Sequence, residues 1–190
     1  VMIAIGSLLF SGCEKENFSP NGKRYVLHEG DNYSTPLVAS GFEGRELIFK
    51  VRFDDTAQYT IDYPFGYPVN KLYGFSDCTS GHHENGARFG WKWEALTEGG
   101  TPVLQIFAYT YADGVRTYEY MTSVPLNQNV SYAIRAENGE YLYEIMTDSG
   151  PVQKRMKRGC SGYGGPKYMA GPYFGGEAPA PHDITIWITD

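Results

Sequence analysis

The sequence has few of the basic residues that a nucleic-acid-binding protein needs. Its 190 residues include 16 Lys and Arg against 22 Asp and Glu, which gives a net charge of −6. Proteins that bind nucleic acid carry an excess of basic side chains, because these displace counterions from the phosphates. We therefore expect no nucleic-acid partner.

The sequence also lacks a sustained helical stripe and any repeat of fixed period, which argues against solenoids and propellers. What it has in abundance is aromatic residues, glycine and proline: 16 Tyr, 10 Phe, 3 Trp, 23 Gly and 11 Pro. Aromatic residues favour strands, and glycine and proline favour tight turns. The composition is that of an all-β protein.

Alternation of apolar and polar residues predicts where the strands lie. Two hairpins are marked by turn residues, Asp113-Gly114 and Asn138-Gly139, which tolerate the positive φ angles that such turns require. The expected strands are Leu47–Phe53, Gln58–Asp62, Lys71–Phe75, Arg88–Ala95, Val103–Tyr111, Val115–Met121, Val130–Ala136, Glu140–Met146 and Asp183–Thr189.

Many short strands separated by long loops rich in Gly and Pro favour two packed sheets over a closed barrel. We therefore predict a two-sheet antiparallel jelly-roll sandwich that covers residues 44–190. Residues 14–43 show little periodicity and contain Ser-Pro-Asn-Gly, so residues 13–43 are expected to lead into the domain as a tether, with order beginning near Tyr25.

The N-terminal segment, from Ile5 to Asn17, is apolar, ends in small residues and Cys13, and is followed by charged residues. It is too short to span a bilayer and is typical of a secretory signal. Ser11-Gly12-Cys13 resembles the lipobox of bacterial lipoproteins, although Phe10 takes the place of the usual leucine. The resemblance implies a signal peptide over residues 1–12, a lipidated Cys13 and a surface location on a bacterial outer membrane.

Cysteine is scarce, with three residues in the chain. If Cys13 carries lipid, Cys78 and Cys160 remain as an even pair in a compartment where disulfides persist. We predict that these two are bonded. The alternative is two separate buried thiols, because residues so distant in sequence are not brought together by spacing alone.

The segment from Lys71 to Trp93 has the densest mixture of polar and aromatic residues and is the best candidate for a site. Adjacent histidines such as His82 and His83 point opposite ways in an extended chain, so they seldom share one ion. The sequence His83-Glu84-Asn85-Gly86-Ala87 has alanine where a zinc protease has its second histidine. We predict no catalytic metal and no cofactor, with a structural calcium ion on loop oxygens left open.

Aromatic faces stack on sugars, and guanidinium groups bind uronate or sulfate oxygens, so this segment also suggests a glycan site. Phe89, Trp91 and Trp93 share one face of their strand, and for at least two of them a place in the core is the favoured interpretation, whereas Tyr109 and Tyr111 suit a concave sheet or the core equally. The residues expected on or beside a concave sheet, or near its rim, are His82, Arg88, Trp93, Tyr109, Tyr111, Tyr173 and His182.

The run Lys154-Arg155-Met156-Lys157-Arg158 holds four positive charges in an otherwise acidic protein. It would attract an anionic polysaccharide to one edge of the fold. The alternative is a solvated edge strand whose charges discourage pairing with other chains.

Three segments, Lys71–Trp93, Gln105–Tyr111 and Tyr173–Ile186, resemble concanavalin-A-like jelly-roll proteins of polysaccharide-degrading bacteria. These include non-catalytic glycan modules, laminarinase-type hydrolases and alginate-type lyases. The hydrolases carry their two catalytic carboxylates on one strand, and this sequence has no such strand. Gln105-Ile106-Phe107 has phenylalanine where the lyases have histidine, and Tyr173-Phe174-Gly175-Gly176 lacks their lysine.

The leading hypothesis is therefore a lipid-anchored protein that binds a polysaccharide or oligosaccharide without cleaving it. Its Arg and Lys residues leave open an anionic glycan as the ligand. The first alternative is a lyase that cuts a uronate polymer by β-elimination, with Arg88 or Arg116 neutralising the carboxylate and His82, His83 or Tyr109 moving protons. The second alternative is a structural or adhesion protein of the surface.

Overall fold

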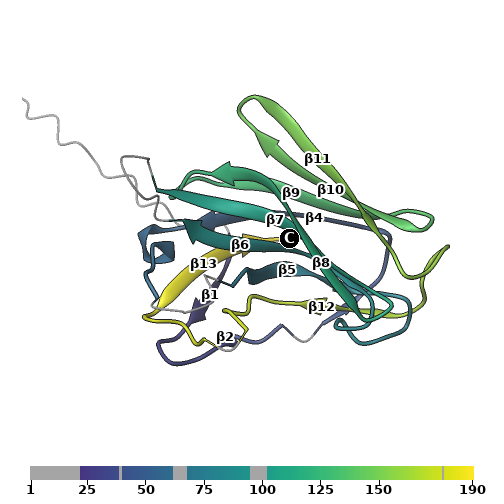
Figure 1. Ribbon diagram of the computed structural model, residues 1–190, viewed down its shortest axis with the longest axis horizontal. Coiled ribbons are helices and arrows are strands. Elements are labelled where there is room, and N and C mark those ends of the chain that lie inside the picture. The colour runs from purple at the N-terminus through teal and green to yellow at the C-terminus, as the bar shows by residue number, and fades with distance from the viewer. Residues whose placement is uncertain (1–21, 39, 62–67, 95–101, 177) are drawn as a thin grey trace, which may run out of the picture.

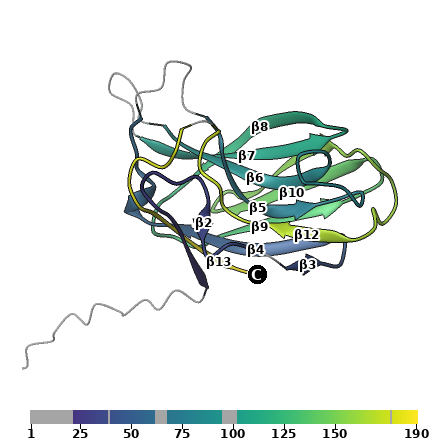
Figure 2. The ribbon, with the colours of Figure 1, turned by 90° about the horizontal axis from the view of Figure 1, so that it is seen from below.

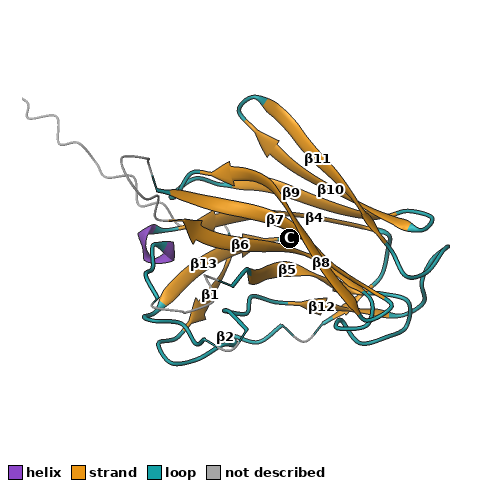
Figure 3. Cartoon of the chain, viewed as in Figure 1, coloured by secondary structure: helices purple, strands orange, loops and turns teal. Residues whose placement is uncertain are grey.

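The computed structural model describes residues 22–38, 40–61, 68–94, 102–176 and 178–190. These residues form strands and loops with no α-helix, and the single 3-10 turn is η1 (Asp55–Ala57) (Figure 3). None of the described residues forms a helix long and apolar enough to cross a membrane. The all-β prediction is confirmed.

Two antiparallel sheets pack face to face, as Figure 1 and Figure 2 show from two sides. The seven-stranded sheet has the order β11 (Gly150–Lys157), β10 (Glu140–Thr147), β9 (Val130–Ala136), β4 (Glu46–Phe53), β13 (Ile184–Thr189), β1 (Lys23–Leu27) and β2 (Ser34–Thr35). The six-stranded sheet has the order β3 (Gly41–Phe42), β12 (Lys167–Ala170), β5 (Asn70–Ser76), β6 (Gly86–Glu94), β7 (Val103–Ala112) and β8 (Val115–Val124). This arrangement is the predicted sandwich.

The core lies between the sheets and is rich in aromatic rings. Phe49 of β4 stacks on Tyr132 of β9, with ring centroids 5.5 Å apart. From the opposite sheet, Phe89 of β6 contacts Tyr132 and Tyr143 edge to face, at 4.9 and 5.2 Å. Burial of such large apolar rings is the main favourable contribution to folding.

Both expected hairpins are present. β7 and β8 pair through Ala112 and Val115, and β9 and β10 pair through Ala136 and Tyr141. Asp113, Gly114 and Gly139 have φ angles of 55°, 75° and 76°, the left-handed region that those turn residues tolerate. By contrast, residues 58–61 of the expected strand Gln58–Asp62 form no strand, and Asp62 lies outside the described residues.

The predicted start of the domain at residue 44 is wrong. Residues 23–42, assigned to the tether, contain β1, β2 and β3. β1 pairs along its whole length with β13, and Tyr25 and Leu27 are buried in the core. The partner of β1 is the last strand of the chain, so no local sequence pattern indicates this pairing. The expected signal over residues 1–12 and Cys13 lie outside the described residues.

Candidate functional site

The candidate site lies on the outer face of the six-stranded sheet. Side chains on β6 and β7 alternate between the core and this face, so Arg88 points away from the core while Phe89 points into it. Strand register then sets the neighbours: Arg88 lies opposite Tyr109 of β7, and Tyr109 lies opposite Tyr118 of β8. At the next position on the same face, Tyr111 of β7 lies opposite Arg116 of β8.

Loops at the edges of this face, together with the strands, surround a cavity of about 310 Å³. A second hollow of about 160 Å³ shares four of its lining residues, and a third of about 70 Å³ shares two. We call the three together the groove. The side chains that give it its chemistry are Tyr33, Lys71, His82, His83, Arg88, Tyr109, Tyr111, Arg116, Tyr118, Tyr168 and Tyr173.

The groove is cationic although the protein is acidic. Lys71, Arg88 and Arg116 line it, and no Asp or Glu is among the described residues that do so. Arg88 is only 5% exposed, and its Nη2 has no hydrogen-bond partner within the described part of the chain. Burial lowers the pKa of this guanidinium. A buried charge without a counter-charge is unfavourable, so the groove is suited to an anion.

Lys71 of β5 is held in place by two contacts. Its Nζ donates to the carbonyl oxygen of Gly175 at 2.7 Å and lies 4.7 Å from the centre of the Tyr173 ring. Burial, followed by repulsion from Arg88 and Arg116, lowers the Lys71 pKa to about 8. Lys71 therefore carries a positive charge at neutral pH, and an anionic ligand would stabilise that charge.

The two histidines lie together at one wall. Residues 82–85 form a turn between β5 and β6, and the rings of His82 and His83 are 4.3 Å apart. The expectation that they point opposite ways is wrong, because it assumed an extended chain. His82 Nδ1 lies 2.8 Å from the hydroxyl of Tyr168, which also accepts the His82 backbone N–H at 2.9 Å.

The surroundings of both histidines favour their neutral forms. Burial, followed by repulsion from Arg88, lowers the pKa of His82 to about 4 and lowers that of His83 as well. Among the described residues, the one cluster with three metal-ligating types is Asp77, Cys78 and Cys160. Its sulfur atoms form a disulfide and its carboxylate binds Arg158, so this cluster is committed to structure. The open question of a structural calcium ion stays a prediction.

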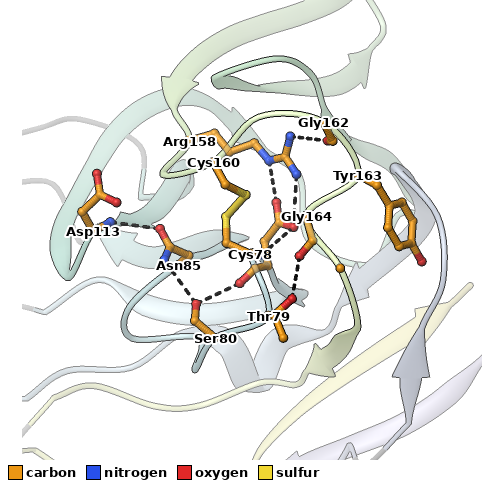
Figure 4. Close-up of a disulfide and its surroundings, with 12 residues drawn as sticks. Cys78, Thr79, Ser80, Asn85, Asp113, Arg158, Cys160, Gly162, Tyr163 and Gly164 are labelled. Atoms are coloured by element: carbon orange, nitrogen blue, oxygen red, sulfur yellow. Dashed lines mark hydrogen bonds and ion pairs between the residues drawn. A yellow bond between two sulfur atoms is a disulfide. The ribbon is translucent and has the colours of Figure 1, made fainter.

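The loop that carries the two histidines also contains a disulfide cysteine, Cys78, and Figure 4 shows this disulfide and its surroundings. Cys78 and Cys160 are bonded, which confirms the predicted pair and links the β5–β6 loop to the β11–β12 loop. Beside it, the buried Asp77 accepts hydrogen bonds from Arg158 Nε at 2.6 Å and from the Tyr141 hydroxyl at 2.9 Å. Buried charges are tolerated when they are paired and hydrogen-bonded in this way.

Asn85 closes the other end of the same loop. Its Oδ1 accepts the backbone N–H of Asp113 at 3.0 Å, and its Nδ2 donates to Ser80 Oγ at 3.2 Å (Figure 4). The loop that carries His82 and His83 is thus held at both ends, and the groove wall is preorganised.

The structure brings together five of the residues expected to bind ligand, His82, Arg88, Tyr109, Tyr111 and Tyr173, and excludes two. Trp93 is buried in the core, because it shares the inner face of β6 with Phe89 and Trp91. His182 is not among the described residues that line the groove; its Nε2 lies 2.9 Å from the carbonyl oxygen of Thr56, next to η1.

Sequence reasoning did not assign ligand contacts to Tyr33, Lys71, Tyr118 and Tyr168. A signal existed for Tyr118, since the short turn after Ala112 fixes which residues of β7 and β8 are opposite. Tyr33, Lys71 and Tyr168 reach the groove from three separate parts of the chain, and no local pattern indicates that they meet.

The basic run is an edge strand rather than part of the groove. Lys154 pairs with Glu119 at 2.9 Å, Lys157 with Asp113 at 3.0 Å, and Arg155 with Glu137 at 2.5 Å. The fourth cation, Arg158, is buried against Asp77. These charges are matched by carboxylates, so the alternative interpretation as a solvated edge strand fits better.

No protein-family model matches the chain, and no curated protein matches it in sequence. Among solved structures, an alginate lyase from Klebsiella pneumoniae is similar, with a TM-score of 0.54 and 12% identity over 76% of this chain and 57% of the lyase. A carbohydrate-binding module from Bacillus subtilis has a TM-score of 0.41 and 10% identity over 85% of this chain and 81% of the module.

A protein of unknown function from Saccharomyces cerevisiae is more distant than the lyase, with a TM-score of 0.44 and 10% identity over 78% of this chain and 72% of that protein. The chain spans less than two thirds of the length of the alginate lyase. At this level of identity the likeness concerns the fold alone, and the fold is a jelly-roll shared with a protein that acts on a carbohydrate.

Proposed function

We propose that this protein binds an acidic polysaccharide in the groove without cleaving it, as an accessory to polysaccharide use. The observation that carries the proposal is Arg88. Its guanidinium is buried beside a cavity of about 310 Å³, has no carboxylate partner among the described residues, and is joined by Lys71. A carboxylate or sulfate group on a glycan supplies the missing counter-charge, and guanidinium groups bind such groups through two parallel hydrogen bonds.

Affinity electrophoresis through gels that contain acidic or neutral polysaccharides tests the proposal. The protein should be retarded by at least one uronate-containing or sulfated polymer and less by neutral ones. Arg88→Met should lose the retardation, because methionine keeps the length of the stem and removes the charge. Arg24→Met is the matched control, since Arg24 lies on β1 of the other sheet.

Absence of retardation on every polysaccharide would contradict the proposal. It would favour the alternative of a structural or adhesion protein, in which the groove takes no glycan. Equal losses in Arg88→Met and Arg24→Met would mean that net charge, and not the groove, governs the retardation.

Cleavage of a uronate polymer is the second candidate, favoured by the hydrogen bond between His82 and Tyr168 beside Arg88. In a β-elimination, Arg88 neutralises the carboxylate and neutral His82 accepts the C5 proton through Nε2. The C4–O4 bond then breaks with its electron pair on O4, which takes a proton from Tyr168, and a double bond forms between C4 and C5. Proton transfer from His82 Nδ1 to Tyr168 across their hydrogen bond makes both groups neutral again, and exchange of the Nε2 proton with solvent restores the starting tautomer of His82.

This second candidate predicts an increase in ultraviolet absorbance from the unsaturated product when the protein is incubated with uronate polymers. The rate should fall in both His82→Ala and Tyr168→Phe. Binding without any absorbance change across several uronate polymers would retire this candidate and leave the first.

The anchoring of the protein is part of the same proposal. Ser11-Gly12-Cys13 supports cleavage after residue 12 and lipidation of Cys13, which would hold the groove at a bacterial outer membrane. Incorporation of labelled fatty acid in cells should occur in the native chain and be lost in Cys13→Ser. Incorporation that persists in Cys13→Ser would contradict this anchor.

A further inference from the structure

The outer face of the six-stranded sheet has two chemically different halves, one in the groove and one that adjoins it. The cationic half lies in the groove and consists of Lys71, Arg88 and Arg116, which surround Tyr109 and Tyr111. The aromatic half consists of Phe107, Tyr118 and Tyr120 on β7 and β8; Tyr118 lines the groove, and the register places Phe107 and Tyr120 next to it. The register places Phe107 opposite Tyr120, one step along the strands from the Tyr109–Tyr118 pair.

The aromatic half is an ordered platform of rings. Phe107 contacts Tyr118 and Tyr120 edge to face, with centroid distances of 6.1 and 5.9 Å. Tyr118 in turn lies nearly parallel to Tyr109, at 5.9 Å and 11°. Tyr118 and Tyr120 are 47% and 50% exposed, so each has surface that a ligand can contact.

The aromatic half offers no unmatched charge. On β6, the position opposite Phe107 is Gly90, which has no side chain. The next residue on that face, Lys92, forms an ion pair with Glu94 at 2.6 Å.

These two halves would hold two kinds of sugar. A carboxylate is stabilised by the ammonium and guanidinium groups of the cationic half. Above the aromatic half the same carboxylate would lose water without gaining a cation, which is unfavourable. The C–H face of an uncharged sugar, in contrast, gains apolar contact with the rings.

We propose that the ligand is a heteroglycan in which acidic and uncharged sugars are neighbours, with an acidic sugar in the cationic half and an uncharged sugar on the aromatic half. This inference rests on the proposed function, binding of an acidic polysaccharide. It differs from that function in excluding homopolymers of uronate as the preferred ligand.

Calorimetric titration with two hexasaccharides tests the inference. One is a hyaluronan fragment, in which glucuronate alternates with N-acetylglucosamine, and the other is an oligogalacturonate, in which every sugar is charged. The homopolymer carries twice the charge, so electrostatic attraction alone favours it. We expect the alternating fragment to bind at least about fivefold more tightly, because its uncharged sugars stack on the rings.

Variants at Tyr120 test whether ring stacking causes the preference for the alternating fragment. Tyr120→Ala should weaken the alternating fragment about fivefold and leave the homopolymer unchanged, whereas Tyr120→Phe should keep the preference. Tyr163→Ala is the matched control, since Tyr163 is 47% exposed, close to the 50% of Tyr120, and lies in the β11–β12 loop rather than on β7 or β8. Thermal unfolding of each variant verifies that it is folded.

The possible failures are distinguishable. If the homopolymer binds as tightly as the alternating fragment or more tightly, this inference is overturned and the proposed function stands. The same holds if Tyr120→Ala weakens both ligands equally. If neither hexasaccharide binds and no acidic polymer retards the protein in gels, the proposed function fails and this inference fails with it.

Discussion

Arg88 is the residue on which the proposed function depends most. The sheet buries its guanidinium without supplying a carboxylate, and its Nη2 has no partner among the described residues. Groups with perturbed pKa values and unsatisfied polar atoms are concentrated at functional sites, because only a ligand completes their interactions.

Arg88→Met should therefore stabilise the free protein while it abolishes binding. Removal of an unpaired buried charge is expected to raise the free energy of unfolding by about 1 kcal/mol, which corresponds to an increase in Tm of about 2–4 °C. Thermal unfolding without ligand measures this. A clear decrease in Tm would assign Arg88 a structural role instead.

His82 should make the stability of the free protein depend on pH. Its pKa is about 4 in the folded protein, below the ordinary value of 6.5, because of burial and then repulsion from Arg88. Between these two values the unfolded chain binds a proton that the folded protein does not, so stability falls as the pH decreases from 6.5 to 4.

His82→Gln should reduce this loss, because glutamine does not titrate. The measurement is Tm against pH for both proteins over that interval. Identical slopes in the two proteins would show that the depressed pKa of His82 does not contribute, and that the pH dependence comes from other groups such as His83.

At the scale of elements, the β5–β6 loop is the feature that most depends on long-range links. The disulfide ties it to the β11–β12 loop, the Asp77–Arg158 pair lies beside the disulfide, and Asn85 binds the β7–β8 turn. This loop carries His82 and His83, which line the groove. Their positions therefore depend on the disulfide, the Asp77–Arg158 pair and the Asn85 hydrogen bond, none of which is made by the histidines themselves.

Cys78→Ser together with Cys160→Ser should lower the free energy of unfolding by about 2–5 kcal/mol, the usual effect of removing a disulfide that closes a long loop. Groove binding should weaken in the same variant, because the wall loses one of its links. Denaturant unfolding and glycan titration measure the two effects. Unchanged stability would show that the Asp77–Arg158 pair holds the loop alone.

Strand β6 has two faces with different roles. Trp93 is buried in the core, whereas Arg88 lines the groove. Trp93→Ala should cost about 3–5 kcal/mol of stability, as is usual for a large buried ring, and should leave the affinity of the folded fraction unchanged. A selective loss of glycan affinity without loss of stability would contradict this assignment.

At the scale of the whole molecule, the two ends of the described chain complete one sheet. β1 and β13 are neighbours, and β13 also pairs with β4. Without β1, the central strand β13 would become an edge with unpaired backbone groups, and Tyr25 and Leu27 would be missing from the core.

A chain that begins at Gly44 should therefore fail to fold cooperatively, whereas one that begins at Gly22 should fold. Near-ultraviolet circular dichroism and thermal unfolding compare the two. A cooperative transition at the same temperature in both would mean that residues 23–43 are an appendage, as their weak periodicity suggested.

Local patterns along the chain were sufficient for the fold class and both hairpins, whereas the pairing of Cys78 with Cys160 was predicted from the number of cysteines. Alternation and turn residues report on each strand separately, because they reflect the conformation of a few successive residues. The same patterns placed Arg88, Tyr109 and Tyr111 in the site, since all three lie on well-marked strands.

Tertiary structure alone decided which face of β6 is buried, that β1 belongs to the domain, and that Lys71 and Tyr168 meet His82. Alternation identifies two faces of a strand but does not say which one is covered, because that depends on the opposing sheet. The error over Trp93 has a different cause: Trp93 was grouped with Arg88, although strand residues an odd number of positions apart lie on opposite faces. The groove is likewise made of residues far apart in the chain, and their proximity is a property of sheet order and loop packing rather than of any segment.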